Sequence, residues 1–355
     1  MDLNNKRVLI IKLSSIGDVF MNIAVVEQIK KSYPEVKLGW VVEKKSSNIL
    51  KNYSSLDKLY ILDKEKIDKL YERKKFIKLF KYIKKFIKNI KKDKWQIAID
   101  LQWLFRSSFI PFMAGIPERY GCVTNGLHSI FLNKNRKIDH ANYPRNVIKK
   151  NTKILTEFGF IKKNINPELF FPQSKEERKW AKKEINKYSG KYFIGIAPLS
   201  KWETKNWGLK NYEKLQEMIK ENMDCDIFVF GGKSDKNDIR KITDKWDNVH
   251  DYSARISLNK FAAMLKYMDV FVSGDSSPMH IAASKNIMQI ALFGPTSPDR
   301  TGPFNKKAVI IQKQYNCIPC FKKKCPLKTS KRKCMLDIKP EEIYYIIENY
   351  LEIKD

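Results

Sequence analysis

Long apolar runs are missing from this chain of 355 residues. No hydrophobic stretch approaches the roughly 20 residues that a membrane-spanning helix needs. The first six residues lead directly into an apolar strand pattern, without the hydrophobic region of a signal peptide. These two absences argue against a transmembrane or secreted protein, and we expect a cytoplasmic one.

Acidic residues are scarce beside basic ones, with 39 Asp and Glu against 69 Lys and Arg and a formal net charge of +30. Such a surplus attracts phosphorylated lipids, nucleotides, nucleic acids or an anionic membrane. The lysines are spread through almost the whole chain, as a lysine-favouring genome would also produce. The charge therefore permits an anionic partner without identifying it. Because no RNA-binding signature is present, we expect no nucleic-acid partner.

A complete P-loop is also missing, although the run GGKS at 231–234 resembles part of one. The motif needs an earlier glycine, and Cys225 and Asp226 occupy the relevant positions. This absence excludes a P-loop NTPase. The chain also lacks an internal repeat, which excludes a repeat architecture.

Two successive series of strand and helix patterns are present. The first opens with the apolar run at 8–11 and the second with the run at 192–197, each typical of a buried parallel strand. Asn and Pro residues mark a break between the two series. The sequence therefore predicts an α/β protein of two facing Rossmann-like domains with the active site in the cleft. The expected boundaries are 1–165 for the first domain, 166–175 for the linker, 176–339 for the second domain, and 340–355 for a C-terminal helix that returns to the first domain.

A strand, a tight turn and a helix follow one another at 269–283. Ser276 and Ser277 can cap the helix, whose first backbone N–H groups then favour an anion. His280 lies one turn into the helix and can add a donor. The turn therefore suits a diphosphate ligand, and the alternative is an ordinary helix cap beside a surface histidine.

The same turn carries a family resemblance. The pattern D-[ST]-x-P-x-H-x-A-A, followed by A-L-F-G-P-T-x-P, resembles the heptosyltransferases of lipopolysaccharide core assembly, glycosyltransferase family 9. The resemblance implies the GT-B architecture, with the acceptor bound by the N-terminal half and the donor by Asp275, Ser276, Ser277 and His280 in the C-terminal half. The family's usual loop reads Asp-Thr/Ser-Gly-Pro. Ser277 replaces that glycine here, which leaves the donor sugar open.

The loop after the first strand contains K-x-S-S-x-G-D-V, which resembles the family's N-terminal motif. The resemblance implies that Asp18 is the catalytic base and that Ser15 and Gly17 lie on the acceptor side. Position alone supports a simpler alternative, in which Asp18 is only a carboxylate that caps the following helix.

A second acceptor-side segment, D-L-Q-x-L-x-R-S, also resembles the family. It implies that Asp100, Gln102 and Arg106 contact the acceptor. The planar guanidinium of Arg106 suits a phosphate or a sugar acid, and the alternative is a surface arginine.

Further donor residues follow the first strand of the second series. Ser200, Lys201 and Lys205 offer a hydroxyl and two point charges to a pyrophosphate leaving group. Lys205 begins a K-x-W run that resembles the family's donor-phosphate motif, whereas without the resemblance these are surface lysines. The resemblance also implies a carboxylate at the ribose, best matched by Asp235 with Asp238 as the alternative. It further implies a helix entry near the adenine at Ile256.

Four of the six cysteines lie near the C-terminus, as Cys317-x2-Cys320-x4-Cys325-x8-Cys334. This spacing supplies the ingredients of a tetrahedral thiolate site for a structural zinc or iron. The alternative is a group of reduced thiols or a labile disulfide. The segment C-x-P-C-F-x-x-x-C-P also resembles the family's tail, and no cofactor is expected to be required for catalysis.

The segment 73–94 places hydrophobic residues at helical spacing and lysines on the other face. Such a helix could lie on an anionic membrane, or it could be a domain helix with a solvated outer face. The two interpretations agree if the apolar stripe packs inward and the lysines meet lipid phosphates.

Together these features predict an inverting glycosyltransferase. It would move a heptose from an ADP-heptose donor to a lipopolysaccharide inner-core acceptor at the cytoplasmic face of the inner membrane. One alternative keeps the enzyme class but uses a protein acceptor, such as an autotransporter, or another nucleotide sugar. A second alternative is a non-catalytic binder of anionic glycolipid that uses the basic surface.

Overall fold

The computed structural model describes residues 1–123, 127–137, 142–329 and 331–354. The chain divides into two compact units, Met1–Pro172 and Gln173–Asp355. The division falls inside the segment 166–175, which the sequence predicts as a linker. Within that segment Leu169 and Phe171 are buried, and the ring of Phe171 lies 5.5 Å from that of Phe20. This part of the segment is therefore packed on the first unit.

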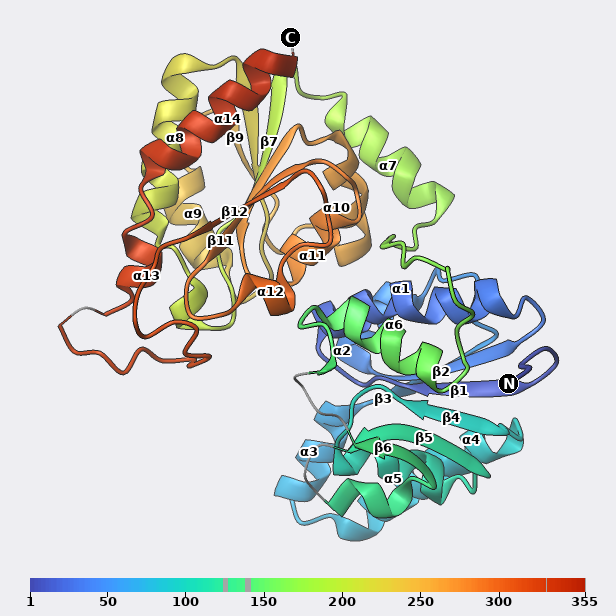
Figure 1. The fold of residues 1–355 in the computed structure, drawn as a ribbon. Coiled ribbons are helices and arrows are strands. Elements are labelled where there is room, and N and C mark those ends of the chain that lie inside the picture. Colours follow the sequence, from blue (N-terminus) through green and yellow to red (C-terminus); the bar gives the residue numbers. More distant parts are fainter. Residues whose placement is uncertain (124–126, 138–141, 330, 355) are drawn as a thin grey trace. The chain divides into compact units, whose positions relative to one another are not determined.

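The first unit is built on a parallel sheet with the strand order β3-β2-β1-β4-β5-β6 (Figure 1). Its strands are β1 (Arg7–Ile11), β2 (Lys37–Glu43), β3 (Lys58–Leu62), β4 (Ile97–Asp100), β5 (Glu118–Val123) and β6 (Lys134–Lys137). Its α-helices are α1 (Ile16–Ser32), α2 (Lys44–Ser47), α3 (Lys64–Glu72), α4 (Phe76–Lys92), α5 (Phe105–Met113) and α6 (Val147–Glu157). Short 3-10 turns are η1 (Asn48–Leu50) and η2 (Leu127–Phe131).

Helices cover both faces of this sheet. Helices α1 and α6 contact each other on one face, while Ile90 of α4 and Ile110 of α5 join a hydrophobic cluster with strand residues on the other. Strand β1 is consequently enclosed, and its run Val8–Ile11 has no exposed surface. A strand buried on both faces reads as a continuous apolar run, which is the pattern seen in the sequence.

The second unit repeats this plan with the strand order β12-β11-β10-β7-β8-β9. Its strands are β7 (Tyr192–Ala197), β8 (Cys225–Val229), β9 (Val249–Asp251), β10 (Val270–Gly274), β11 (Met288–Phe293) and β12 (Ala308–Gln312). Its α-helices are α7 (Lys175–Ile185), α8 (Leu209–Asn222), α9 (Lys236–Thr243), α10 (Leu258–Met264), α11 (Ser277–Ala283), α12 (Pro298–Thr301), α13 (Lys333–Leu336) and α14 (Pro340–Lys354). The 3-10 turns are η4 (Glu203–Lys205) and η5 (Leu265–Tyr267). Among the described residues, no helix combines the length and apolar character that crossing a membrane requires.

The two sheets share one connectivity. Counted within each unit, the strand order is 3-2-1-4-5-6, the doubly wound arrangement of dinucleotide-binding folds. Strand order reverses between β1 and β4 in the first unit and between β7 and β10 in the second. Ligands of such sheets bind at the carboxyl ends of the strands on either side of this reversal. The topology therefore directs attention to the loops that follow β1, β4, β7 and β10.

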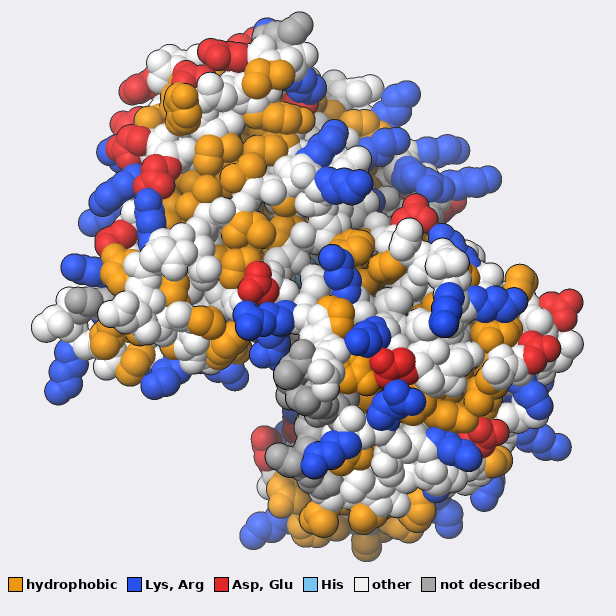
Figure 2. Space-filling model, in the orientation of Figure 1, with side chains coloured by type: hydrophobic (Ala, Val, Ile, Leu, Met, Phe, Trp, Pro, Cys, Tyr) orange, Lys and Arg blue, Asp and Glu red, His pale blue; other side chains and the backbone are white. Residues whose placement is uncertain are grey.

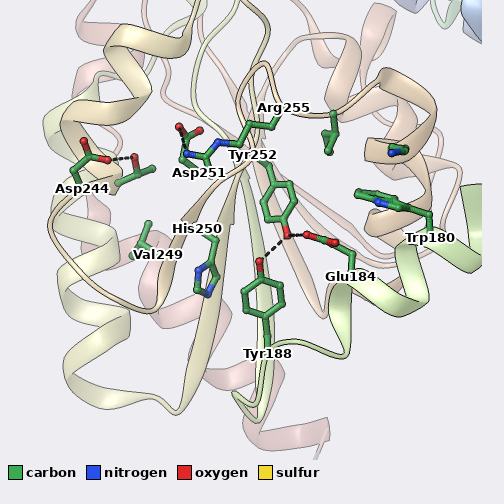
Figure 3. Close-up of a pocket in the computed structure, with 12 residues that line it drawn as sticks. Trp180, Glu184, Tyr188, Asp244, Val249, His250, Asp251, Tyr252 and Arg255 are labelled. Atoms are coloured by element: carbon green, nitrogen blue, oxygen red, sulfur yellow. Dashed lines mark hydrogen bonds and ion pairs between the residues drawn. The ribbon is translucent and has the colours of Figure 1, made fainter.

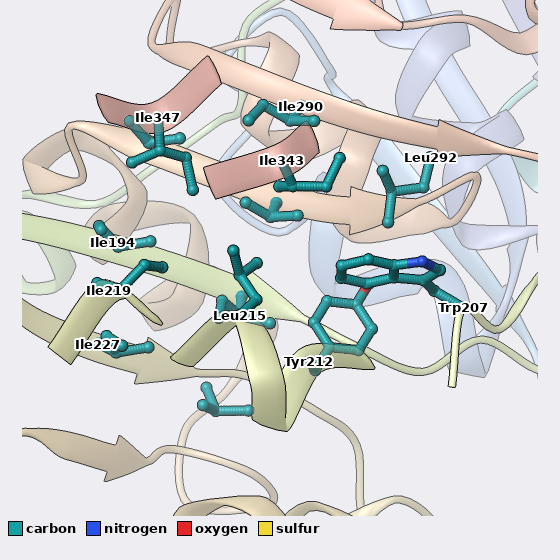
Figure 4. Packing of buried hydrophobic residues seen from close by; sticks show 14 of the residues in the cluster. Ile194, Trp207, Tyr212, Leu215, Ile219, Ile227, Ile290, Leu292, Ile343 and Ile347 are labelled. Carbon is teal, nitrogen blue, oxygen red and sulfur yellow. The ribbon is translucent and has the colours of Figure 1, made fainter. Parts of the chain in front are cut away.

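The C-terminal helix α14 belongs to the core of the second unit. Ile343, Ile347 and Leu351 are buried in one cluster with Leu215 and Ile219 of α8 (Figure 4). Figure 1 shows α14 running along α8. The sequence predicted that residues 340–355 return to the first domain, and the structure corrects this prediction because the apolar face of α14 is buried in the second unit. Residue 355 lies outside the described residues.

This packing yields a stability prediction. Ile347→Ala removes a fully buried side chain and leaves a cavity, so it should lower the free energy of unfolding of the second unit by about 2–5 kcal/mol. Ile353→Ala, on the same helix at 87% exposure, should change it by less than about 0.5 kcal/mol. Urea unfolding followed by tryptophan fluorescence measures both variants. Equal effects would contradict the placement of α14.

Candidate functional site

A buried ion pair joins the predicted donor residues of the second unit. The Lys205 ammonium donates to Asp275 Oδ2 at 2.6 Å and to the Asp275 carbonyl oxygen at 3.2 Å. The same carboxylate oxygen accepts from the hydroxyls of Thr296 at 2.8 Å and Thr301 at 3.4 Å. The side chains of Lys205 and Asp275 are 16% and 5% exposed. The network brings together the loops that follow β7, β10 and β11, three neighbouring strands.

The backbone of this site is close-packed at Gly274, the last residue of β10. A Cβ atom at this position would lie 2.9 Å from the carbonyl oxygen of Lys205, a contact that real side chains essentially never make. Glycine is therefore required for the loop after β7 to lie directly over the end of β10. The ring of Trp202, from the same loop, lies 4.6 Å from the Lys205 ammonium, a cation-π contact that further fixes the lysine.

The predicted helix cap follows this pair. Ser276 is the residue before α11, and its hydroxyl oxygen is buried without a hydrogen-bond partner among the described residues. Ser277 begins the helix with an ordinary backbone angle, so the conformation does not require the glycine that the family usually has there. His280 is buried one turn further on, rather than being the surface histidine of the alternative interpretation.

The other predicted donor residues lie on neighbouring loops. The Ser200 hydroxyl donates to the Trp202 carbonyl oxygen at 3.1 Å, whereas Lys201 is exposed. Asp235 precedes α9, and its carboxylate accepts from the Gly232 N–H at 2.8 Å and from the hydroxyl of Ser234 at 2.9 Å. Asp235 thus organises the turn after β8, the strand next to β7.

Ile256 is the one predicted donor residue that lines a cavity of about 490 Å³ along the edge strand β9. Figure 3 shows Glu184, Tyr188 and Tyr252 meeting there, with the Tyr252 hydroxyl 2.7 Å from Glu184 Oε1 and 2.6 Å from the Tyr188 hydroxyl. Lys205 and Asp275 do not line this cavity. The cavity on β9 and the Lys205 network are therefore two separate places in the second unit.

In the first unit, the loop after β1 holds Asp18 in the first turn of α1. Asp18 Oδ2 accepts from the backbone N–H of Ser15 at 3.1 Å and from the Ser15 hydroxyl at 3.0 Å. Gly17 is buried in the same turn. Asp18 therefore caps the helix, as the simpler interpretation states, and its carboxylate is half-buried. Capping uses one oxygen and leaves the other to act on a ligand.

Two predicted acceptor residues from the loop after β4 reach this loop. The Ser14 N–H donates to Gln102 Oε1 at 3.3 Å, and Arg106 Nη2 donates to the Ser14 hydroxyl at 3.4 Å. Arg106 also pairs with Glu43 at the end of β2, at 3.4 Å. The structure thus brings Asp18, Gln102 and Arg106 to the reversal point between β1 and β4.

Comparison with known proteins identifies the family. The family model of glycosyltransferase family 9 (heptosyltransferase) matches residues 83–331. The chain belongs to glycosyltransferase family 9. Lipooligosaccharide heptosyltransferase 2 of Campylobacter jejuni is 27% identical over 266 residues, which cover 72% of this chain and 76% of that protein.

Solved structures agree on the fold. A glycosyltransferase family 9 protein of Veillonella parvula has a TM-score of 0.83 at 19% identity and covers 99% of this chain and 98% of its own. The ADP-heptose lipopolysaccharide heptosyltransferase II of Escherichia coli has a TM-score of 0.78 at 20% identity and covers 98% of this chain and 99% of its own. These likenesses confirm the predicted GT-B class, and family membership confirms a glycosyltransferase over a non-catalytic binder.

One predicted acceptor residue of this glycosyltransferase needs correction. Asp100 is 1% exposed, and its carboxylate accepts from the hydroxyls of Ser107 and Ser108 at 2.8 and 2.6 Å and from the N–H groups of Gln102 and Trp103. Burial raises the pKa of this carboxyl, and the four hydrogen bonds oppose the rise. Asp100 is therefore a scaffold for the loop that carries Gln102 and Arg106, because its oxygens are not open to an acceptor.

Lys12 is a further candidate to which the sequence interpretation gave no role. It is 8% exposed, and burial lowers its pKa while the charges of Asp18 and Asp100 oppose that change. Lysine is almost never buried without such compensation. The lysine stands first in K-x-S-S-x-G-D-V, but only the fold shows that it lies near two carboxylates. Thr296 was missed for the same reason, since a threonine after a strand carries no signal of its contact with Asp275.

The four C-terminal cysteines gather without forming a coordination sphere. Cys317, Cys320, Cys325 and Cys334 line one small cavity of about 50 Å³. Burial, and the charge that the other three cysteines carry as thiolates, raise the pKa of Cys334 to about 11. In the part of the chain that the structure describes, no three His, Cys, Asp or Glu side chains are arranged to hold one metal ion. The four thiols are therefore close neighbours that do not form a metal-binding arrangement in this structure.

The ion pair yields a second prediction. Asp275→Asn leaves the Lys205 ammonium without a counter-charge at 16% exposure, so it should lower the free energy of unfolding by about 1–3 kcal/mol. The matched control is Glu213→Gln, which breaks the exposed pair with Lys245 and should cost less than about 1 kcal/mol. Urea denaturation measures both. A neutral Asp275→Asn would show that the pair does not hold the three loops together.

Proposed function

We propose that this family 9 glycosyltransferase moves a heptose from an ADP-heptose donor to the inner core of lipopolysaccharide, with inversion at the anomeric carbon. The observation that carries the proposal is the position of Lys205, half-buried at the strand reversal of the second sheet. Two of the three proteins named above, those of Campylobacter jejuni and Escherichia coli, are heptosyltransferases of lipooligosaccharide and lipopolysaccharide. The predicted site in a cleft between the domains stays a prediction.

The donor half of the reaction concerns the diphosphate. As the bond from the anomeric carbon to the phosphate oxygen breaks, its electron pair leaves with ADP and negative charge grows on the diphosphate. Lys205 supplies a positive charge held by Asp275 and Trp202. The buried Ser276 hydroxyl and His280 lie on the turn beside it. We assign the ribose to Asp235 and the adenine to the region of Ile256.

The acceptor half concerns a proton. The attacking hydroxyl of the acceptor must lose its proton as the new bond forms, and a carboxylate within hydrogen-bond reach can take it. We assign this role to Asp18 and assign acceptor phosphate or acid groups to Arg106, with Ser15, Gly17 and Gln102 lining the same turn. Attack from the face opposite ADP inverts the configuration.

Asp18→Asn tests the base. The amide keeps the size and can still accept from the Ser15 N–H, so the helix cap is kept and ADP affinity should be unchanged. The change removes one of the two carboxylates near the buried Lys12, so we expect a small loss of stability that leaves the protein folded. Turnover should fall by a factor on the order of 10² to 10⁴ because the amide cannot take a proton. Steady-state kinetics and a thermal melt of the same sample measure this. Normal turnover, or a loss explained by early melting, would restrict Asp18 to its capping role.

The overall reaction is tested by offering a panel of nucleotide sugars and truncated core acceptors, with products read by mass spectrometry. We expect a mass gain of one heptose with ADP-heptose and a core acceptor. The anomeric coupling in the product's NMR spectrum reports inversion. Transfer only to a protein acceptor, or only from another nucleotide sugar, would contradict the substrate assignment while leaving the enzyme class intact.

We further propose a cytoplasmic enzyme that meets its acceptor at the inner membrane surface.

We also propose a structural zinc or iron at the four cysteines. The closeness of the four thiols supports the metal, although they are not arranged as metal ligands in this structure. Because Lys205 can carry the leaving-group charge, brief EDTA treatment should leave the transfer rate unchanged. Metal analysis of fresh protein tests the site directly, and finding neither zinc nor iron would leave four free thiols.

A further inference from the structure

Only the C-terminal half of the apolar stripe of α4 packs against the rest of the first unit. Its C-terminal half packs inward, since Ile90 is buried and Phe86 and Ile87 pack against the same cluster. Its N-terminal half does the opposite, because Phe76, Ile77 and Phe80 are 55%, 73% and 66% exposed. The sequence left open whether this helix lies on a membrane or packs on the domain, and Phe76, Ile77 and Phe80 do not pack inward. Exposed apolar residues gathered in this way mark an interaction site.

A fourth exposed residue extends this surface. Tyr71, at the end of α3, is 65% exposed, and its ring lies 6.0 Å from that of Phe76 in an edge-to-face contact. We call Tyr71, Phe76, Ile77 and Phe80 the α4 tip. Helix α5, which packs on the same cluster as α4, also exposes apolar side chains. Figure 2 shows hydrophobic side chains gathered at the lower end of the first unit, with Lys and Arg beside them.

A basic groove lies beside the α4 tip. It has a volume of about 390 Å³ between α3 and α4, and its basic lining consists of Lys44, Lys66, Lys69, Arg73, Lys75 and Lys78. The two acidic residues of the lining, Asp63 and Glu65, are paired with Lys44 and Lys45. No carboxylate partner is found for Lys69, Arg73, Lys75 or Lys78 within the described part of the chain. The groove therefore presents unneutralised positive charge.

We propose that the α4 tip and the basic groove dock the protein on a bilayer that contains anionic phospholipid. Helix α4 carries seven lysines and no acidic residue. An interfacial helix of this composition inserts its apolar side chains below the headgroups while its lysines meet lipid phosphates. This inference rests on the proposed function for one point only: a lipopolysaccharide acceptor gives the protein a reason to contact a membrane.

Charge favours a membrane over a second copy of the chain as the partner of this surface. A symmetric dimer through this surface would bring the lysines of both copies together, which like-charge repulsion opposes. A membrane supplies the opposite sign. The topology also suits lipid-linked substrates, since α3 begins at the carboxyl end of β3 and α4 returns to the start of β4. The α4 tip therefore lies toward the sheet edge that carries Asp18 and Arg106.

The apolar part is tested by flotation with vesicles of phosphatidylethanolamine and phosphatidylglycerol, without sugar donor or acceptor. The double variant Ile77→Ser with Phe80→Ser should reduce the bound fraction about tenfold or more. Its control is Tyr345→Ser with Ile353→Ser, which removes two equally exposed side chains of α14 and should bind as wild type. Equal losses in both double variants would overturn the proposal.

The basic part is tested by Lys69→Gln, Lys75→Gln and Lys78→Gln combined, which should weaken binding on the order of 10²-fold at low salt. The matched control replaces three exposed lysines of α7, Lys179, Lys182 and Lys183, and should weaken it far less.

Wild-type binding to pure phosphatidylcholine vesicles as strong as to anionic ones would contradict the proposal. So would a sedimentation experiment in which the α4 tip variant loses a dimer. Transfer to an acyl-free core acceptor should be unchanged in every variant. Vesicle binding therefore tests the membrane proposal, and transfer to the acyl-free acceptor separately tests the proposed function.

Discussion

Three loops of the second unit depend on one ion pair. Lys205 and Asp275 come from loops 70 residues apart, and their contact ties the ends of β7 and β10 together while Thr296 and Thr301 add the loop after β11. A lysine this buried needs its counter-charge, so the pair constrains where three loops lie. The same constraint keeps a positive charge at the strand reversal, where doubly wound sheets bind their ligands.

In the first unit, two aspartates organise the loops that follow β1 and β4. Asp100 accepts hydrogen bonds from four donors and fixes the loop that carries Gln102 and Arg106. Asp18 uses one carboxylate oxygen to cap α1. The two residues look alike in sequence, since each lies near the carboxyl end of a buried strand: Asp100 is the last residue of β4, and Asp18 lies in the first turn of the helix that follows β1. Only burial distinguishes them, because it decides which carboxylate a ligand could reach.

Much of the fold could be predicted because buried parallel strands produce continuous apolar runs, as at Val8–Ile11 and Tyr192–Ala197. The position of α14 could not, since an apolar helical face does not specify which domain it covers. The exposed half of α4 could not be predicted for the same reason. Helical spacing indicates an apolar face but does not show which part of the protein, if any, covers it. For the site, motifs located the loops. The electrostatic interaction of Lys12 with Asp100 and the hydrogen bond of Thr296 to Asp275 required the structure.

The central claim is that Lys205, in the loop that follows β7, holds the diphosphate of the donor. Isothermal titration of wild type and Lys205→Ala with ADP, and with adenosine as the ligand that lacks the diphosphate, tests it most directly. The account predicts that Lys205→Ala loses about tenfold or more in ADP affinity, because a charge-assisted contact is removed, while adenosine binds both proteins alike. ADP binding of equal strength in both proteins would contradict it.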